Sequence, residues 1–210
     1  MERFEHVQSN ILKHIKKNRS CMEGYMEVSQ STSITEVAQI MKKYWDEVLG
    51  MHLESSLVLF SDFFADFQEE FNRNAIYFNQ DTAEGYALVY NGKMKIAGTV
   101  KARSFGESEI DLSGKASLIA FGESKINACG ESTVILKEQS TAVMFDQCEI
   151  RAFDHSSIIC QGGKTVTLSD YSKASVFKCG SVHGYGNTEV TLNNERMRSR
   201  VFLHEESVFV

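Results

Sequence analysis

The chain has 210 residues, with 14 glycines and no proline, where average usage gives about ten prolines. Its hydrophobic fraction of 42% and charged fraction of 24% are those of a globular protein, and the missing proline excludes proline-rich linkers and collagen-like sequence. No apolar run approaches the length of a membrane span. Five cysteines without a CxxC pair indicate reduced thiols. We therefore expect a cytoplasmic protein with no membrane segment.

The net charge of −6 is unevenly distributed. Residues 1–92 carry 8 Lys and Arg against 14 Asp and Glu, whereas residues 93–210 carry 14 of each. This shift predicts two domains, a helical N-terminal unit over residues 1–84 and a repeat domain over residues 85–210. Neither part is basic enough for a non-specific nucleic-acid binder.

The first part has the periodicity of amphipathic helices. Apolar residues spaced by three and four predict a helix over residues 2–17, and a second segment over residues 21–28 continues the pattern. Ser33 followed by Glu36 forms a capping box before a wide apolar stripe. Ser61 caps a further helix that is rich in phenylalanine. We interpret the aromatic residues as a small helical core rather than as a ligand pocket.

Strand signals follow the helices. Residues 75–78 have the composition of a short strand. The dipeptide Asn91-Gly92 lies between two strand-like runs, residues 86–90 and 93–96, and is a strong hairpin-turn signal. We therefore expect these two runs to pair as a β-hairpin.

From Lys93 to Arg196 the chain repeats every eight residues without a gap, and one more octad, Arg200–Ser207, follows a three-residue insertion. A fixed period of this kind indicates a solenoid. Positions two and four of the octad are apolar, which predicts a short strand with these side chains inward. Position six is usually Gly or Asp, which tolerate a left-handed corner, and position eight is most often Ser, which can bond the corner backbone.

The number of octads in one coil is inferred from similarity between stacked residues. At a spacing of three octads, position five groups similar residues, whereas at a spacing of two octads it mixes aromatic, basic and hydroxyl side chains. This favours a mainly β fold, a short triangular parallel β-helix of three octads per coil behind a small α-helical unit. A two-faced solenoid with two octads per coil remains the alternative. One column of the 24-residue register contains Phe105, Cys129, Phe153 and Phe177.

The unit Gly/Asp-x-Ser-x-Val/Ile-x-Ala-Phe resembles the octapeptide-repeat β-helix proteins of gut bacteria and their phages and other mobile elements. The resemblance covers roughly residues 93–207. It implies the β-helix architecture behind a helical segment and a role associated with mobile elements, and it implies no activity.

The 24-residue register predicts two flat, nearly uncharged outer faces. Both have β-branched residues in mid-prism, which suits them to contact with protein. We expect an interface with a partner protein or with a second copy of the chain, with a homodimer favoured. The interface candidates are Ile119, Val143 and Thr167 on one face and Ile135, Ile159 and His183 on the other.

The third predicted face carries cations beside the phenylalanine column, a combination that can hold phosphates and stack bases. Acidic residues lie close to these cations and the domain is neutral, so a solvated strand face is favoured and a nucleic-acid partner is not expected. The residues of this face are Lys101, Arg103, Lys125, Asn127, Glu149, Arg151, Lys173 and Ser175.

One acidic corner is a candidate for carbohydrate chemistry. Asp146 and Asp170 occupy one corner column in the 24-residue register, with Glu123 a coil earlier, and paired carboxylates on adjacent coils resemble a retaining glycosidase site. Aspartate is also a good corner residue, and the cysteines lack the spacing of a metal site. We therefore expect a non-enzymatic interaction or assembly protein without metal or cofactor, with carbohydrate binding or cleavage as the alternative.

Overall fold

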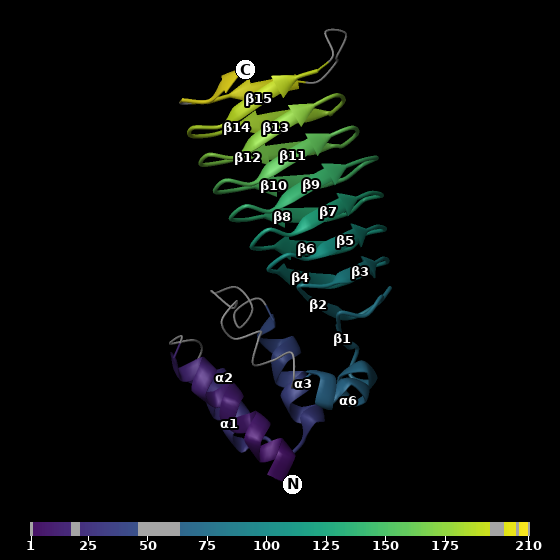
Figure 1. The fold of residues 1–210 in the computed structure, drawn as a ribbon, viewed down its shortest axis with the longest axis vertical. Coiled ribbons are helices and arrows are strands. Elements are labelled where there is room, and N and C mark those ends of the chain that lie inside the picture. The colour runs from purple at the N-terminus through teal and green to yellow at the C-terminus, as the bar shows by residue number, and fades with distance from the viewer. Residues whose placement is uncertain (1, 18–21, 46–63, 194–199, 205, 210) are drawn as a thin grey trace. The chain divides into compact units, whose positions relative to one another are not determined.

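The computed structural model describes residues 2–17, 22–45, 64–193, 200–204 and 206–209. It divides into two compact units, Met1–Phe78 and Asn79–Val210 (Figure 1). The division lies slightly before the boundary predicted after residue 84. The described chain has no helix that is both long enough and apolar enough to cross a membrane.

The first unit is helical, as predicted. Successive helices are in contact, and the last of them packs on a short strand. The buried side chains include Trp45 and Phe71, and the Phe64 ring lies 4.7 Å from Phe71 and 4.8 Å from Phe78 between centroids. The aromatic residues described here are therefore core residues. The elements are α1 (Glu2–Lys17), α2 (Met22–Gln30), α3 (Ile34–Lys43), α6 (Gln68–Arg73) and β1 (Ile76–Phe78).

The predicted cap of α3 is confirmed in part. The Ser33 hydroxyl accepts a hydrogen bond from the Glu36 backbone N–H at 3.3 Å. A capping box would have the Glu36 carboxylate accept from the backbone N–H of Ser33. It accepts instead from the backbone N–H of Thr32, one residue earlier, at 2.6 Å. The predicted cap at Ser61 lies outside the described residues.

The second unit is a parallel β-solenoid, which confirms the predicted class of fold. Its strands alternate between two sheets, stacked coil upon coil (Figure 1). In this unit sheet A consists of β2 (Tyr86–Tyr90), β4 (Lys101–Phe105), β6 (Ser117–Ala120), β8 (Thr133–Leu136), β10 (Glu149–Ala152), β12 (Thr165–Leu168), β14 (Ser181–Gly184) and β16 (Arg200–Leu203). Sheet B consists of β3 (Lys93–Ile96), β5 (Glu109–Leu112), β7 (Lys125–Ala128), β9 (Thr141–Met144), β11 (Ser157–Cys160), β13 (Lys173–Val176), β15 (Glu189–Leu192) and β17 (Val208–Phe209).

The coil has two octads, and the predicted triangular coil of three octads is wrong. Glu149 pairs with Thr165 and Thr165 with Ser181, a step of two octads each time. The prediction failed because it required stacked residues to be alike. Unlike neighbours stack favourably here, since the Lys137 ammonium lies 5.5 Å from the centroid of the Phe121 ring in a cation–π contact.

The predicted hairpin around Asn91-Gly92 is also wrong. The strands on either side of it belong to different sheets, because β2 pairs in parallel with β4 and β3 with β5. Asn91 does have the left-handed conformation that the turn signal requires, with φ 45°. The signal therefore marked a corner of the solenoid.

Positions two and four of the octad form the solenoid core, as predicted. These side chains are buried in both sheets except near the end of the stack, where Leu192 is 43% exposed and Leu203 is half-buried, and each stacks on its counterpart one coil away. Burial of a branched aliphatic side chain contributes about 1.5–3 kcal/mol. Core residues include Ile110, Leu112, Leu118, Ala120, Ile126, Ala128, Val134, Leu136, Ile150, Ala152, Val166 and Leu168.

The corners explain the remaining octad positions. We call the turns from sheet A to sheet B corner 1 and those from sheet B to sheet A corner 2. Position six of corner 1 has positive φ in coil after coil, at 68° for Gly122 and 55° for Asp154. The serine at position eight is buried and donates to the carbonyl at position five, as Ser124 does to Phe121 at 2.8 Å. Both predictions for these positions are confirmed.

Candidate binding surface

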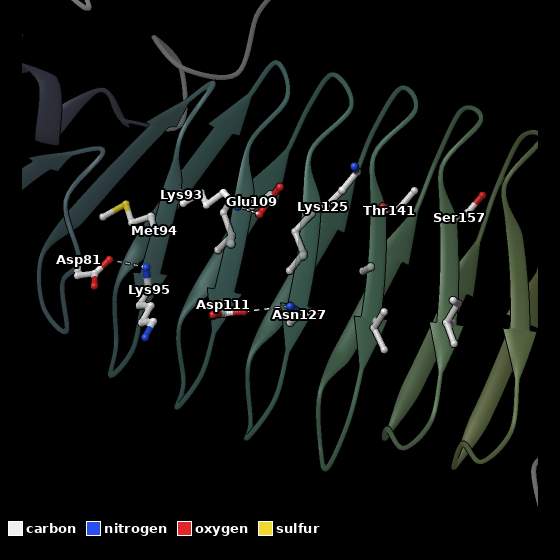
Figure 2. Close-up of a pocket in the computed structure, with 15 residues that line it drawn as sticks. Asp81, Lys93, Met94, Lys95, Glu109, Asp111, Lys125, Asn127, Thr141 and Ser157 are labelled. Carbon is white, nitrogen blue, oxygen red and sulfur yellow. Dashed lines mark hydrogen bonds and ion pairs between the residues drawn. The ribbon is translucent and has the colours of Figure 1, made fainter.

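A groove of about 790 Å³ lies on the outer face of sheet B. Its floor is formed by β3, β5, β7, β9 and β11, which lie side by side in Figure 2. Because side chains alternate between faces, positions one and three of each strand form two rows across these strands. The first row is Lys93, Glu109, Lys125, Thr141 and Ser157, and the second is Lys95, Asp111, Asn127, Val143 and Ile159, with Asp81 beside them.

One end of the groove is charged and internally paired. The Lys93 ammonium lies 2.6 Å from the Glu109 carboxylate, and the hydrogen bond between them lowers the pKa of Glu109 and raises that of Lys93. The Asp111 carboxylate accepts from the Asn127 amide at 3.0 Å. Both carboxylates therefore already have partners on neighbouring coils.

The other end of the groove, which lies in the middle of sheet B, is uncharged. Here β9 and β11 present Thr141 and Ser157 in the first row and Val143 and Ile159 in the second. We call these four residues the central patch. Ile159 is 42% exposed, and Thr141 is exposed as well. The next strand outward on each side begins with a lysine, Lys125 or Lys173.

The structure regroups the six predicted interface residues. Val143 and Ile159, assigned to different faces by sequence, are neighbours in the groove. The other four lie along the outer face of sheet A, where Ile119 pairs with Ile135. Further along the same row Thr167 pairs with His183, whose ring stacks on Phe202 with centroids 4.9 Å apart. The predicted nearly uncharged face is wrong for these four residues, because Arg151 lies between Ile135 and Thr167 in the same row of sheet A.

The predicted cationic face does not exist as one surface. Its residues divide between the two sheets, so the alternation of cations with phenylalanines is lost. Lys101, Arg103, Glu149 and Arg151 belong to sheet A, and Lys125, Asn127, Lys173 and Ser175 belong to sheet B. Sequence reasoning therefore placed Lys125 and Asn127 on a different face from Val143. Lys93, Glu109 and Lys125 are two octads apart and alternate in charge, and this pattern was the sequence signal that could have placed them on one face.

The acidic corner is likewise not one site. Asp146 belongs to corner 2, whereas Asp170 belongs to corner 1, and Glu123 lies three coils before Asp170. Asp146 accepts from the Gly130 N–H at 3.1 Å and Asp170 from the Asp154 N–H at 3.3 Å. These aspartates satisfy backbone donors of the preceding coil, which is the structural role of a corner residue. The separation removes the paired-carboxylate arrangement on which carbohydrate cleavage depended.

The solenoid carries four thiols, and they do not form a metal centre. Among the described residues no group of three or more His, Cys, Asp and Glu side chains could hold a metal ion. Cys148 lies 3.1 Å from the Ser132 hydroxyl, and Cys129 donates to the Leu112 carbonyl at 3.5 Å. Cys160 ends β11 and Cys179 lies in the corner after β13, and both are buried.

Comparison of the chain with protein-family models, with curated proteins and with solved structures finds no match. The resemblance to octapeptide-repeat β-helix proteins therefore stays a prediction, and the functional argument depends on the geometry of the surfaces described above.

Proposed function

We propose that this chain is a non-enzymatic assembly module that binds a second copy of itself through the groove on sheet B. The observation that carries the proposal is the central patch. It is uncharged and partly exposed at Ile159, and it is bordered on both sides by strands that begin with lysine. An uncharged centre with a charged rim matches the depletion of charged residues at the core of protein interfaces.

The central patch is self-complementary, as a two-fold interface requires. A two-fold axis along the solenoid axis reverses strand direction, so the first row of one copy meets the second row of the other. Thr141 then faces Val143 of a second copy, and Ser157 faces Ile159. Lys125 faces Asn127 rather than another lysine. By the same rule Lys93 faces Lys95 and Glu109 faces Asp111, and these like charges are offset within each copy by the Lys93–Glu109 ion pair and the Asn127–Asp111 hydrogen bond.

A carbohydrate partner is disfavoured by the composition of the groove. Flat sugar faces are bound by stacking on aromatic rings, and none of the fifteen residues that line the groove is aromatic. The carboxylates Glu109 and Asp111 are held by Lys93 and Asn127, which leaves them poorly placed to bind sugar hydroxyls.

The test is the concentration dependence of mass in solution. The wild-type chain is expected to form dimers, measured by sedimentation equilibrium or by light scattering after gel filtration. Thr141→Lys with Ile159→Lys buries unpaired charge in the interface and is expected to raise the dimer Kd at least about tenfold.

The matched control is Thr133→Lys with Ile135→Lys, which places the same charges at the equivalent octad positions of β8 on sheet A. This variant is expected to dimerise like the wild type. A wild-type chain that stays monomeric at every concentration contradicts the proposal, and so does equal dissociation of both double variants.

A further inference from the structure

Two of the four thiols in the solenoid lie against each other. Cys160 ends β11, and Cys179 lies in the corner one coil later, residues 177–180. The Cys160 thiol donates to the carbonyl of Lys178 at 3.1 Å, which places its sulfur beside the residue before Cys179. The Cys179 thiol donates to the carbonyl of Ser181 at 3.2 Å.

The backbone around this pair departs from the octad rule. Corner 2 has positive φ at position six in its earlier turns, at 73° for Gly114 and 55° for Asp146. The two turns nearest the thiols lack it, at Gly162 and Lys178. The corners beside the thiol pair therefore have a different geometry from the rest of the stack.

The two sulfurs have different chemical character. Interaction with the Cys160 side chain lowers the pKa of Cys179, while the same interaction and burial raise the pKa of Cys160. Cys179 is 5% exposed, and its neighbours Lys178 and Gly180 are exposed. Since the thiolate is the nucleophile, Cys179 is suited to react first and Cys160 to react second.

We propose that Cys160 and Cys179 form an oxidisable dithiol, which closes into a disulfide by exchange with a low-molecular-weight disulfide such as oxidised glutathione. This site is independent of the groove on sheet B and of self-association.

The exchange takes place in two steps. The Cys179 thiolate attacks one sulfur of the small disulfide, whose S–S bond breaks and releases one small thiolate, which takes up the proton that Cys179 lost. Cys160 then attacks the Cys179 sulfur of the mixed disulfide and expels the second small thiolate, which takes up the Cys160 proton. Two protein thiols are oxidised and one small disulfide is reduced to two thiols.

The remaining described thiols serve as internal controls. Cys148 is engaged by the Ser132 hydroxyl, and Cys129 bonds a backbone carbonyl. Trypsin places Cys160 and Cys179 on separate peptides, residues 152–164 and 179–196, and Cys129 and Cys148 on two others. A peptide map therefore distinguishes every pairing among the four.

The experiment treats the folded, full-length chain with oxidised glutathione, blocks free thiols in denaturant and measures intact and peptide masses. The expected product carries two blocking groups fewer than the reduced chain treated in the same way, and it links residues 152–164 to 179–196. Cys160→Ser is expected to keep a glutathione adduct on Cys179, whereas Cys179→Ser forms neither adduct nor link. The Cys129→Ser, Cys148→Ser double variant is expected to form the link as the wild type does.

The wild-type peptide map decides the proposal even where a variant fails to fold. A linkage to Cys129 or Cys148, or a folded wild-type chain whose thiols all remain free after treatment, overturns it. A glutathione adduct on Cys160 in the Cys179→Ser variant overturns the assigned order of attack.

Discussion

Whether a corner glycine can be replaced depends on its backbone angle and on the space beside its Cα. Gly114 and Gly186 have nearly the same φ, 73° and 72°. A Cβ on Gly114 would lie 2.8 Å from the backbone nitrogen of Gly98 in the neighbouring coil. A Cβ on Gly186 would meet nothing closer than 3.5 Å. The two positions therefore separate conformational strain from steric overlap.

We predict that Gly186→Ala destabilises the solenoid by about 1–2 kcal/mol, the cost of a left-handed alanine. Gly114→Ala adds a clash with backbone that cannot move independently, and its expected cost is about 3–4 kcal/mol. Urea unfolding followed by circular dichroism measures both, with the wild type as reference. Equal costs at the two positions would show that the neighbouring coil yields to the new methyl group.

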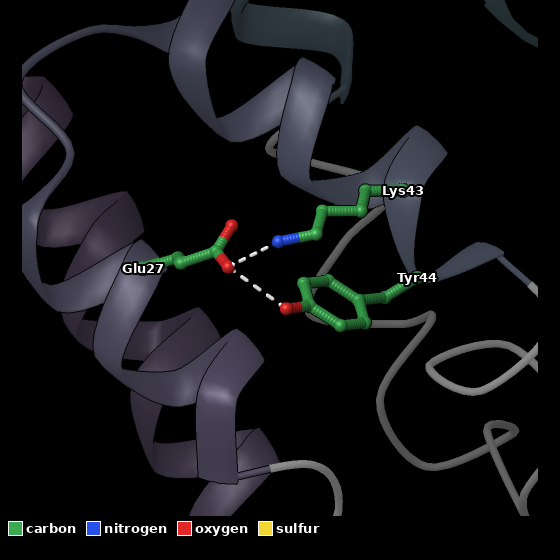
Figure 3. Close-up of polar contacts among 3 residues, drawn as sticks. All are labelled: Glu27, Lys43 and Tyr44. Carbon is green, nitrogen blue, oxygen red and sulfur yellow. Dashed lines mark hydrogen bonds and ion pairs between the residues drawn. The ribbon is translucent and has the colours of Figure 1, made fainter.

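At the scale of helices, α2 and α3 are joined by a polar contact (Figure 3). The Glu27 carboxylate of α2 accepts from the Lys43 ammonium at 2.5 Å and from the Tyr44 hydroxyl at 2.8 Å. The hydrogen bond from Lys43, followed by that from Tyr44, lowers the pKa of Glu27 below its ordinary value of 4.5. A lowered carboxyl pKa stabilises the folded state above the unfolded pKa, and this contribution is lost as pH falls through the folded value.

The expected result is that Glu27→Gln lowers the urea midpoint of the helical unit at pH 7. The difference from the wild type should disappear below the folded pKa of Glu27, where the wild-type carboxyl is protonated. Trp45, the single tryptophan of the chain, is buried in this unit and reports its unfolding by fluorescence. Glu23→Gln in the same helix is the control, and a pH-independent effect of Glu27→Gln would refute the electrostatic explanation.

At the same scale, the sequence was sufficient to predict strands and corners but not the coil. Inward positions, left-handed corners and bonding serines follow from local residue chemistry, so each octad could be predicted alone. The coil size depends on which octads stack on one another. A coil of two similar octads and a coil of three are both compatible with the same local pattern. Charge complementarity between residues two octads apart was a better guide to the coil size than similarity between stacked residues. Lys93 forms an ion pair with Glu109, and Lys173 forms one with Glu189, each across a step of two octads.

The same reason explains what could be predicted of the candidate surface. Val143 and Ile159 were predicted as exposed, β-branched interface residues, because that property belongs to each strand by itself. Their adjacency, and that of Asp111 with Asn127, depends on which strands stack. The Cys160–Cys179 contact had no sequence signal, because the two residues occupy different octad positions in an irregular part of corner 2.

Across the whole solenoid, each coil packs only on the coil before and the coil after it. Middle strands such as β8 and β10 therefore have neighbours on both sides, whereas β16 and β17 are each the last strand of their sheet in the described chain. Side chains become more exposed in the same direction: Leu136 of β8 is fully buried, Leu203 of β16 is half-buried and Phe209 of β17 is 58% exposed. Stability in such an array is a sum of coil and neighbour contributions.

We predict that amide hydrogen exchange is slowest in β8–β11 and becomes faster toward β16 and β17, because opening begins where a coil has one neighbour. Leu203→Ala, at a half-buried site, is expected to speed exchange in β14–β17 alone. Leu136→Ala leaves a cavity in the middle of the stack, at a cost of about 2–5 kcal/mol, and is expected to speed exchange on both sides of β8. Mass spectrometry of pulse-labelled peptides separates these regions. Uniform protection along the solenoid, with both variants speeding every strand equally, would mean that the coils open together as one cooperative unit.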